Sequence, residues 1–106
     1  MIDLGLEGKR AVVSGAGYIP TRAGHGRHSA LNLAAAGATV ACIDIDEGRA
    51  QGIVGEIEEA GGKAFYVLAD MTDLAQVRRA LDEAVSTLGG IDVCVDIIGK
   101  ASWNQA

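Results

Sequence analysis

Four short apolar runs alternate with segments of helical pattern, and this alternation constrains the fold more than any other feature of the 106-residue chain. The runs are rich in Val and Ile, and the first two show little polar alternation, which is typical of strands covered on both faces. Strands that alternate with helices form a parallel sheet with right-handed crossovers. We therefore predict one α/β domain in the order β-α-β-α-β-α-β. The expected strands are residues 10–13, 39–43, 64–69 and 91–98.

The three segments between these runs carry the signals of helices. Segment 24–36 is rich in Ala and Leu and stops at Gly37, a residue that suits the position after a helix. In segments 46–60 and 73–88, apolar residues recur at the spacing that places them on one face of a helix. The first of these faces comprises Ala50, Ile53, Val54 and Ile57, and the second comprises Val77, Leu81, Ala84, Val85 and Leu88.

Individual residues mark the ends and the weak points of these helices. Asp73 or Thr72 can cap the start of the last helix, and Gly89-Gly90 close it. Gly52 and Gly55 lie inside the middle helix, where each costs about 1 kcal/mol relative to Ala. We therefore expect the middle helix to be the least stable of the three.

The charge balance excludes several classes of partner. The chain has 9 Lys and Arg against 14 Asp and Glu, a formal net charge of −5 with His neutral. A surface for nucleic acid or an anionic membrane needs a basic stripe, so we expect neither partner. Residues 1–10 carry two acids and no apolar block, and no run of 18 apolar residues follows. We therefore expect no signal peptide, no membrane span and a cytoplasmic location.

Cys42 and Cys94 each lie inside an apolar run. A disulfide between them is possible by count alone. In a cytosolic chain two buried free thiols are the stronger expectation.

A glycine-rich stretch joins the first expected strand to the first expected helix. It contains Gly15, Gly17 and the sequence Gly24-His25-Gly26, which can open the helix. Glycines let a chain turn sharply and approach a phosphate without a Cβ in the way, and the N–H groups and dipole of the next helix attract the anion. The stretch therefore predicts a phosphate-binding loop. The alternative is that these glycines serve only a tight turn between strand and helix.

Asp44 ends the second expected strand, 20 residues after Gly24. In dinucleotide sites an acid near this distance accepts hydrogen bonds from the adenosine ribose hydroxyls. A carboxylate there would also repel a 2′-phosphate, so we predict that NAD is preferred over NADP. Arg22, in the glycine-rich stretch, is the residue that could reverse this preference. The alternative is that Asp44 is a solvated residue or a helix cap.

His25 and His28 lie three residues apart at the start of the first expected helix. No Cys or carboxylate cluster accompanies them in the sequence, as a metal site would require. We predict structural or solvent-facing roles for both and no metal site.

The chain resembles the N-terminal half of the short-chain dehydrogenase/reductases from about residue 6 to residue 99. The acidic turn Asp70-Met71-Thr72-Asp73 is similar to the turn in which that family's acid and the next backbone N–H hold the adenine. The other similar segments are 6–16 for the opening strand, 35–40 for the end of the first helix and the second strand, and 91–95 for the entry to the fourth strand.

The resemblance implies a Rossmann-type parallel sheet with four strands in the order 3-2-1-4 and three helices. It implies NAD as cofactor, hydride transfer to or from a small alcohol or carbonyl substrate, and a homo-oligomeric full enzyme. It also implies a set of cofactor-binding residues. These are Ser14, Gly15, Gly24, His25, Gly26, Asp44, Ile45, Asp70, Met71 and Gly99.

Two departures from the family pattern concern the cofactor loop and the fourth strand. The family signature is Thr-Gly-x-x-x-Gly-x-Gly, whereas eight residues separate Gly15 from Gly24 here, an insertion of five. The family's Asn-Asn-Ala-Gly is Asp96-Ile97-Ile98-Gly99, of which only Gly99 matches. Because Asp96 has no amide N–H₂ donor, the bracing that the first Asn gives the sheet must be altered.

The family's catalytic pattern Tyr-x-x-x-Lys does not occur in the chain, because Asp70 follows Tyr66 at that spacing and Arg22 follows Tyr18. We therefore name no catalytic residue. We interpret residues 1–106 as the N-terminal dinucleotide-binding portion of a dehydrogenase whose catalytic half is absent, and we expect this chain alone to be inactive. One alternative is a non-catalytic nucleotide-binding module. Another is a methyltransferase-like Rossmann domain, which the match of the acidic turn at residues 70–73 makes the weaker alternative.

The implied strand order leaves the fourth strand at an edge if nothing follows it. Residues 93–98 are mostly apolar, and an unpaired edge is a template for another chain. We therefore expect the isolated chain to pair through this edge or to aggregate.

Overall fold

The computed structural model describes residues 6–15 and 25–96 of the chain, and it shows a parallel sheet of four strands with three helices. The sheet order is β3-β2-β1-β4, and all three strand pairs are parallel. This confirms the predicted α/β class and the strand order 3-2-1-4. The elements are β1 (Arg10–Ser14), α1 (His25–Ala35), β2 (Thr39–Asp44), α2 (Glu47–Glu59), β3 (Lys63–Leu68), α3 (Leu74–Leu88) and β4 (Val93–Asp96).

The predicted element ends lie within one residue of the observed ones, except in the last strand. That strand was expected over 91–98, but β4 begins at Val93, and Ile97 and Ile98 lie outside the described residues. Asp92 does not extend the strand because its N–H donates to Arg10 O at 2.8 Å and its carboxylate accepts from Arg10 N at 2.9 Å. These bonds form the connection that leads into β4.

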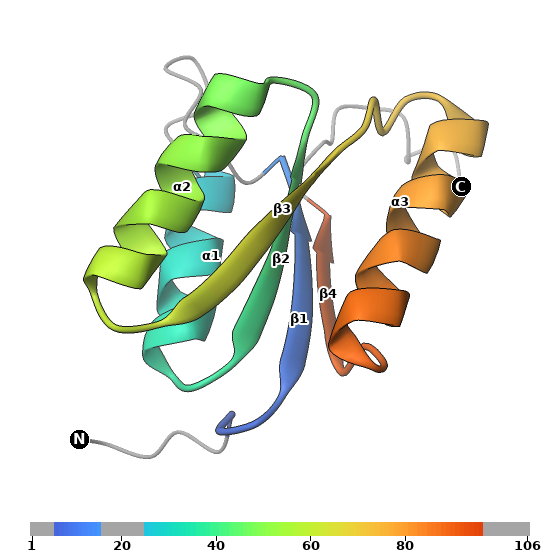
Figure 1. Ribbon diagram of the computed structural model, residues 1–106. Helices are drawn as coiled ribbons and strands as arrows, with labels where there is room; N and C mark the ends of the chain where they lie inside the picture. Colours follow the sequence, from blue (N-terminus) through green and yellow to red (C-terminus); the bar gives the residue numbers. More distant parts are fainter. Residues whose placement is uncertain (1–5, 16–24, 97–106) are drawn as a thin grey trace.

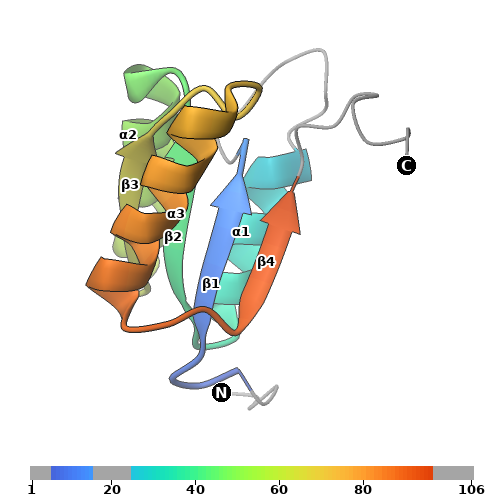
Figure 2. The same ribbon diagram turned by 90° about the vertical axis from the view of Figure 1, so that its right-hand side faces the viewer.

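Helices cover the two faces of the sheet unequally. Both α1 and α2 pack on one face, where α1 contacts β1, β2 and β4 and α2 contacts β2 and β3. On the other face α3 contacts β2 and β3, and Figure 2 shows it in front of these two strands. Among the described elements, no helix lies over β4 on that face.

Side chains of the inner strands point alternately to the two faces of the sheet, and each face has its own hydrophobic core. Toward α1 and α2 the core contains Ala11, Val13, Val40, Cys42, Ile53 and Ile57. Toward α3 it contains Val12, Ala41, Ile43, Val67, Ala80 and Ala84. Burial on both faces explains why β1 and β2 read as continuous apolar runs in the sequence.

Two residues of α3 differ from the expected apolar face. Ala80, which was not in the predicted set, is fully buried, whereas Val85, which was in it, is 41% exposed. The buried line of α3 therefore runs through Ala80 and Ala84, which pack with strand residues in the core on that face.

The expectation for the two cysteines is half right. No disulfide joins Cys42 to Cys94, and Cys42 is buried, but Cys94 is exposed, so the predicted burial of Cys94 is wrong. Cys94 pairs in register with Val12, whose side chain belongs to the core beneath α3. The side chain of Cys94 therefore points to the face of β4 that α3 does not cover.

The ends of the helices follow the sequence signals. Asp73 caps α3 by accepting from Ala75 N at 3.0 Å, and Gly89 ends this helix in the left-handed region with φ of 87°. After α1, Gly37 has φ of 107°, and a Cβ there would lie 2.9 Å from the Cα of Glu7. Only glycine fits this turn, because both the backbone angle and the close approach exclude a side chain.

Candidate functional site

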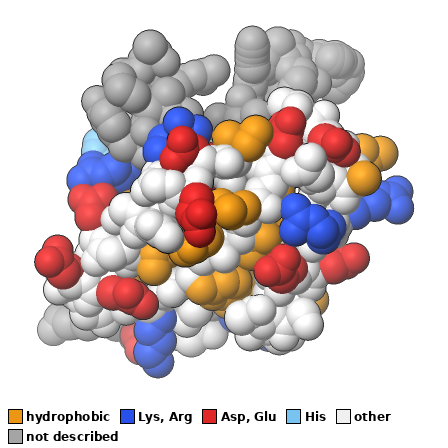
Figure 3. All heavy atoms as spheres, turned by 45° about the horizontal axis from the view of Figure 1, so that its top comes forward, with side chains coloured by type: hydrophobic (Ala, Val, Ile, Leu, Met, Phe, Trp, Pro, Cys, Tyr) orange, Lys and Arg blue, Asp and Glu red, His pale blue; other side chains and the backbone are white. Residues whose placement is uncertain are grey.

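All four strands run in the same direction, so their carboxyl ends meet at one edge of the sheet, at the top of Figure 1. Ser14 ends β1, Asp44 ends β2, and Asp70 follows the end of β3 by two residues. The topology thus brings three predicted site residues to one edge, the edge at which open α/β sheets bind ligands. Figure 3 turns this edge toward the viewer and shows acidic and basic side chains interspersed over it.

The end of β1 is fixed where the glycine-rich stretch begins. Gly15 has φ of 65°, and its N–H donates to Ile43 O at 2.7 Å, which ties the turn to β2. Ser14 is 3% exposed, and its hydroxyl donates to Val95 O at 3.4 Å. The chain therefore leaves the sheet at a fixed point, in a conformation that favours glycine.

The other predicted loop residues are described only in part. The first turn of α1 begins at His25, where the glycines predicted it, and Gly26 is buried in that turn. The turn holds no acid, which suits the positive end of a helix dipole for an anion. Gly24, Gly99, the inserted loop and the side chain of His25 lie outside the described residues.

Arg27, in the first turn of α1, is held on α2. Its Nε donates to Glu56 Oε1 at 2.8 Å, and Nη2 also bonds to that carboxylate. The hydrogen bond from Arg27 lowers the pKa of the Glu56 carboxyl. This ion pair joins α1 to α2.

Asp44 lies at the end of β2 as a buried carboxylate, 4% exposed. Its Oδ1 accepts from Asp46 N at 2.9 Å and from Arg49 Nη2 at 3.1 Å. Asp44 O accepts from Ala69 N at 3.0 Å and so links the ends of β2 and β3. The next residue, Ile45, is 61% exposed. Asp44 is therefore a buried, ion-paired carboxylate rather than the solvated residue of the alternative interpretation.

Sequence reasoning did not find Arg49. It follows Asp44 by five residues and lies in the first turn of α2, whose N-cap Asp46 accepts from Arg49 N at 2.9 Å. This turn directs its side chain back toward the strand end. One sequence signal could have identified Arg49. It is a basic residue in the first turn of the helix that follows the acid, and that turn begins at the edge of the sheet where the strand ends.

Asp70 and Met71 lie beside the end of β3. Asp70 Oδ1 accepts from Thr72 N at 2.9 Å and from Thr72 Oγ1 at 2.6 Å, and these bonds lower the pKa of Asp70. Asp70 N donates to Gln76 Oε1 at 2.8 Å. No described residue bonds to Oδ2 of Asp70, and Met71 packs against the core beneath α3. The turn thus holds the Asp70 carboxylate in place through its Oδ1 atom.

Over residues 6–15 and 25–96, no group of three metal-ligating side chains comes together. His28 is exposed. In the same part of the chain, no helix is long and apolar enough to cross a membrane.

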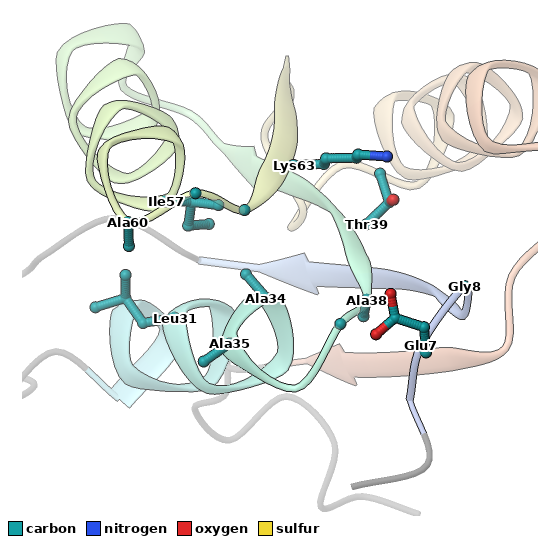
Figure 4. Close-up of a pocket in the computed structure, with 13 residues that line it drawn as sticks. Glu7, Gly8, Leu31, Ala34, Ala35, Ala38, Thr39, Ile57, Ala60 and Lys63 are labelled. Carbon is teal, nitrogen blue, oxygen red and sulfur yellow. The ribbon is translucent and has the colours of Figure 1, made fainter. Parts of the chain in front are cut away.

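A cavity of about 380 Å³ lies at the opposite edge of the sheet, between the ends of α1 and α2. Figure 4 shows Leu31 of α1 opposite Ala60 at the end of α2, with Lys63 and Thr39 at the amino ends of β3 and β2. None of the predicted cofactor-binding residues lines it. The cavity is therefore separate from the edge where Asp44 and Asp70 lie.

At the carboxyl edge, the described residues can be compared with the chemical groups of the pyrophosphate and adenosine parts of a dinucleotide. A turn with a glycine and an acid-free helix start suits a pyrophosphate, a carboxylate on the second strand suits ribose hydroxyls, and a carboxylate after the third suits an amino-bearing base. The residues present therefore fit a dinucleotide cofactor.

The family model of the short chain dehydrogenases matches residues 9–105. The 7alpha-hydroxysteroid dehydrogenase of Escherichia coli (strain K12) is 38% identical over 97 residues, which are 92% of this chain and 36% of that protein. The (-)-trans-carveol dehydrogenase of Rhodococcus erythropolis is 35% identical over 109 residues, covering 92% of this chain and 38% of that protein. The chain thus spans a little over a third of the length of these relatives.

Solved structures give the same result. A short-chain dehydrogenase/reductase from Burkholderia xenovorans matches with a TM-score of 0.81 and 36% identity, over 90% of this chain and 36% of that one. A 7α-hydroxysteroid dehydrogenase in complex with NADH and 7-oxo glycochenodeoxycholic acid matches with a TM-score of 0.77 and 37% identity, over 84% of this chain and 33% of that one. These matches do not favour the methyltransferase-like alternative. The chain belongs to the short chain dehydrogenase family.

Proposed function

We propose that residues 1–106 form the dinucleotide-binding portion of an NAD-dependent oxidoreductase. The longer enzyme would move a hydride between nicotinamide and a small alcohol or carbonyl substrate. The observation that carries this proposal is the meeting of Gly15, Asp44 and Asp70 at the carboxyl edge of one parallel sheet. Membership of the short chain dehydrogenase family supports the reaction class.

The pyrophosphate and the adenosine half of the cofactor have proposed partners in the chain. The turn from Ser14 through Gly15 and the start of α1 would hold the pyrophosphate, because the helix N-terminus offers N–H donors. Asp44 would accept hydrogen bonds from the adenosine ribose hydroxyls. Asp70 and the N–H of Met71 would hold the adenine, as the family resemblance implies.

The nicotinamide ring supplies the hydride chemistry when the cofactor is bound, and the protein binds and orients it. Proton transfer at the substrate oxygen needs a positioned acid or base. The sequence Tyr-x-x-x-Lys, which serves this purpose in the family, does not occur in the chain. We therefore propose that catalysis requires a further segment and that this chain binds cofactor without turnover.

Asp44 is also the basis for the proposed preference for NAD. A carboxylate and a phosphate charge about 4 Å apart repel by about 4 kcal/mol at an effective dielectric of 20. This figure is an upper value, because Arg49 lies 3.1 Å from the same carboxylate and offsets part of the repulsion. We expect NAD to bind more tightly than NADP, by a smaller factor than Asp44 alone would give.

A calorimetric titration of the chain with NADH and NADPH tests the proposal. We expect tighter binding of NADH, and Asp44→Asn should weaken NADH by about tenfold, equivalent to about 1.4 kcal/mol. Asp82→Asn is the matched control because it removes the same charge from an exposed position on α3. Tighter NADPH binding, or an Asp44→Asn variant with unchanged NADH affinity, would contradict the role of Asp44.

A further inference from the structure

The cavity at the amino edge of the sheet lies apart from the proposed cofactor site and has the size of a small-molecule site. Its volume is about 380 Å³, and pockets that hold small organic ligands begin at about 300 Å³. Apolar side chains of α1 and α2 line it, and Figure 4 shows Leu31 of α1 opposite Ala60 at the end of α2. Ile57 contributes a further apolar wall. The cavity therefore offers a surface that a small hydrocarbon group would cover.

The carboxylate of Glu7 lies at this cavity, beside the end of α1. Glu7 lines the cavity, and a Cβ on Gly37, just after α1, would lie 2.6 Å from Glu7 Oε1. The last carbonyls of a helix carry a partial negative charge, so Glu7 faces a charge of its own sign there. Neither α1 nor α2 has a basic residue in its last turn to offset this charge. Among the described residues, Glu7 forms no ion pair.

Lys63 also lines the cavity, but its side chain belongs to the other face of the sheet. It pairs in register with Thr39, and the next residues of the two strands, Ala64 and Val40, pack in the core toward α1 and α2. Side chains alternate along a strand, so those of Lys63 and Thr39 are directed to the face that carries α3. Figure 4 shows these two side chains next to each other. The Lys63 ammonium therefore does not fill the space between α1 and α2.

The charge at this cavity suits a cation, and its apolar walls suit an organic one. A primary ammonium group donates three hydrogen bonds, which a carboxylate and the free carbonyls at helix ends can accept. A metal ion would need several side-chain ligands, and over residues 6–15 and 25–96 no group of three comes together. The acceptors and the apolar walls together therefore favour a primary amine with a compact hydrocarbon part.

We propose that this cavity is a second binding site, which takes a small primary amine. Its ammonium group would bond to the Glu7 carboxylate, and its hydrocarbon part would lie between Leu31 and Ile57. The site lies at the edge of the sheet opposite to Asp44 and Asp70, so it does not depend on the proposed dinucleotide function. A bound amine would contact α1, α2 and the segment before β1 at once, and would therefore stabilise the folded chain.

The experiment is an NMR titration of the isotope-labelled chain with hexylamine, hexanol and hexanoate, which share a hydrocarbon chain and differ in charge. Hexylamine should shift the backbone amide signals of Leu31, Gly37 and Gly61, which line the cavity. We expect a Kd of about 1 mM, as suits a ligand of this size. Hexanol should bind about tenfold more weakly, because it lacks the charge, and hexanoate should bind more weakly still.

Two variants separate the carboxylate from the apolar walls. Glu7→Gln should weaken hexylamine about tenfold and leave hexanol unchanged, because it removes the charge and keeps the walls. Ala60→Leu should weaken hexylamine and hexanol alike, since the larger side chain would enter the cavity. Glu83→Gln is the matched control for Glu7→Gln, because it removes the same charge from an exposed position on α3, across the sheet. It should leave the affinity for hexylamine unchanged.

Added salt and circular dichroism complete the test. Salt should reduce the advantage of hexylamine over hexanol in the wild type, because it screens the attraction between ammonium and carboxylate. Far-UV circular dichroism checks that each variant is folded. Unchanged hexylamine affinity in folded Glu7→Gln would exclude the carboxylate as the partner.

Other results would also overturn the proposal. Hexylamine that shifts no amide signal around the cavity at about 10 mM would show that the cavity is not an amine site. Equal affinities for the three probes would show that it has no preference for a cation, and tighter binding of hexanoate would assign the charge preference to Lys63 instead. Shifts centred on Asp44 and Asp70 would place the amine at the carboxyl edge.

Discussion

Replacing two glycines inside α2 should stabilise the fold by an amount that the structure allows us to calculate. Gly52 and Gly55 are exposed interior residues of the helix, and a Cβ at either position would have no atom within 4 Å. Alanine there meets no clash and restricts the unfolded chain more than glycine does. Each substitution should therefore raise the free energy of unfolding by about 1 kcal/mol. The double variant should gain about 2 kcal/mol, because neither added methyl group has a tertiary partner.

Gly61 provides the matched control just after the same helix. A Cβ at Gly61 also has no atom within 4 Å, but its φ is +92°. An L-residue in the left-handed region costs about 1–2 kcal/mol. Gly61→Ala should therefore lower the free energy of unfolding, although it adds the same methyl group to equally open space.

Urea denaturation followed by circular dichroism measures these changes. With a urea m-value of about 2 kcal/mol/M, the Gly52→Ala/Gly55→Ala variant should shift the midpoint upward by about 1 M. The midpoint of Gly61→Ala should move downward. If alanine at Gly52 or Gly55 lowers the midpoint, or if Gly61→Ala raises it, backbone conformation does not decide the cost of these glycines and the reasoning is wrong.

Three further predictions concern single side chains. Hydrogen bonds from the Arg10 side chain and backbone lower the pKa of Asp92 from 3.8 to about 2, so the stability that this pair adds is present above pH 4 and is lost as the pH falls toward 2. The free energy of unfolding should therefore fall less between pH 4 and pH 2 in Asp92→Asn than in the wild type. If the two proteins show parallel dependences of this free energy on pH, the pairing is refuted. Burial, together with the Asp44 charge, raises the pKa of the Cys42 thiol to about 12, whereas Cys94 is exposed. Mass-mapped maleimide labelling of the native chain should modify Cys94 alone, and rapid labelling of Cys42 would contradict its burial. Ile57 is 1% exposed, so Ile57→Ala should cost about 2–5 kcal/mol in urea denaturation, and a cost below about 1 kcal/mol would show that the site collapses around the smaller side chain.

The sequence alone determined the order of the elements and most of their ends. Apolar periodicity, capping by Asp73 and the positive φ of Gly37 act through neighbouring residues, so they are visible in a short window of sequence. The position of Asp44 at the end of β2 also follows from these local signals, because a parallel sheet brings the carboxyl ends of its strands to one edge. The ends of the strands therefore sufficed to predict that Ser14, Asp44 and Asp70 lie at the same edge of the sheet.

Only the tertiary structure decided which side chains meet. Arg10 and Asp92 pair across 82 residues, and no local pattern distinguishes that arginine from a solvated one. Cys94 lies in an apolar run yet is exposed, because its burial depends on which strands α3 covers. Arg49 reaches Asp44 because a capped first turn aims its side chain back over the strand end. Such contacts depend on how helices are placed against the sheet, and that placement is set by the packing of the whole core rather than by neighbours in sequence.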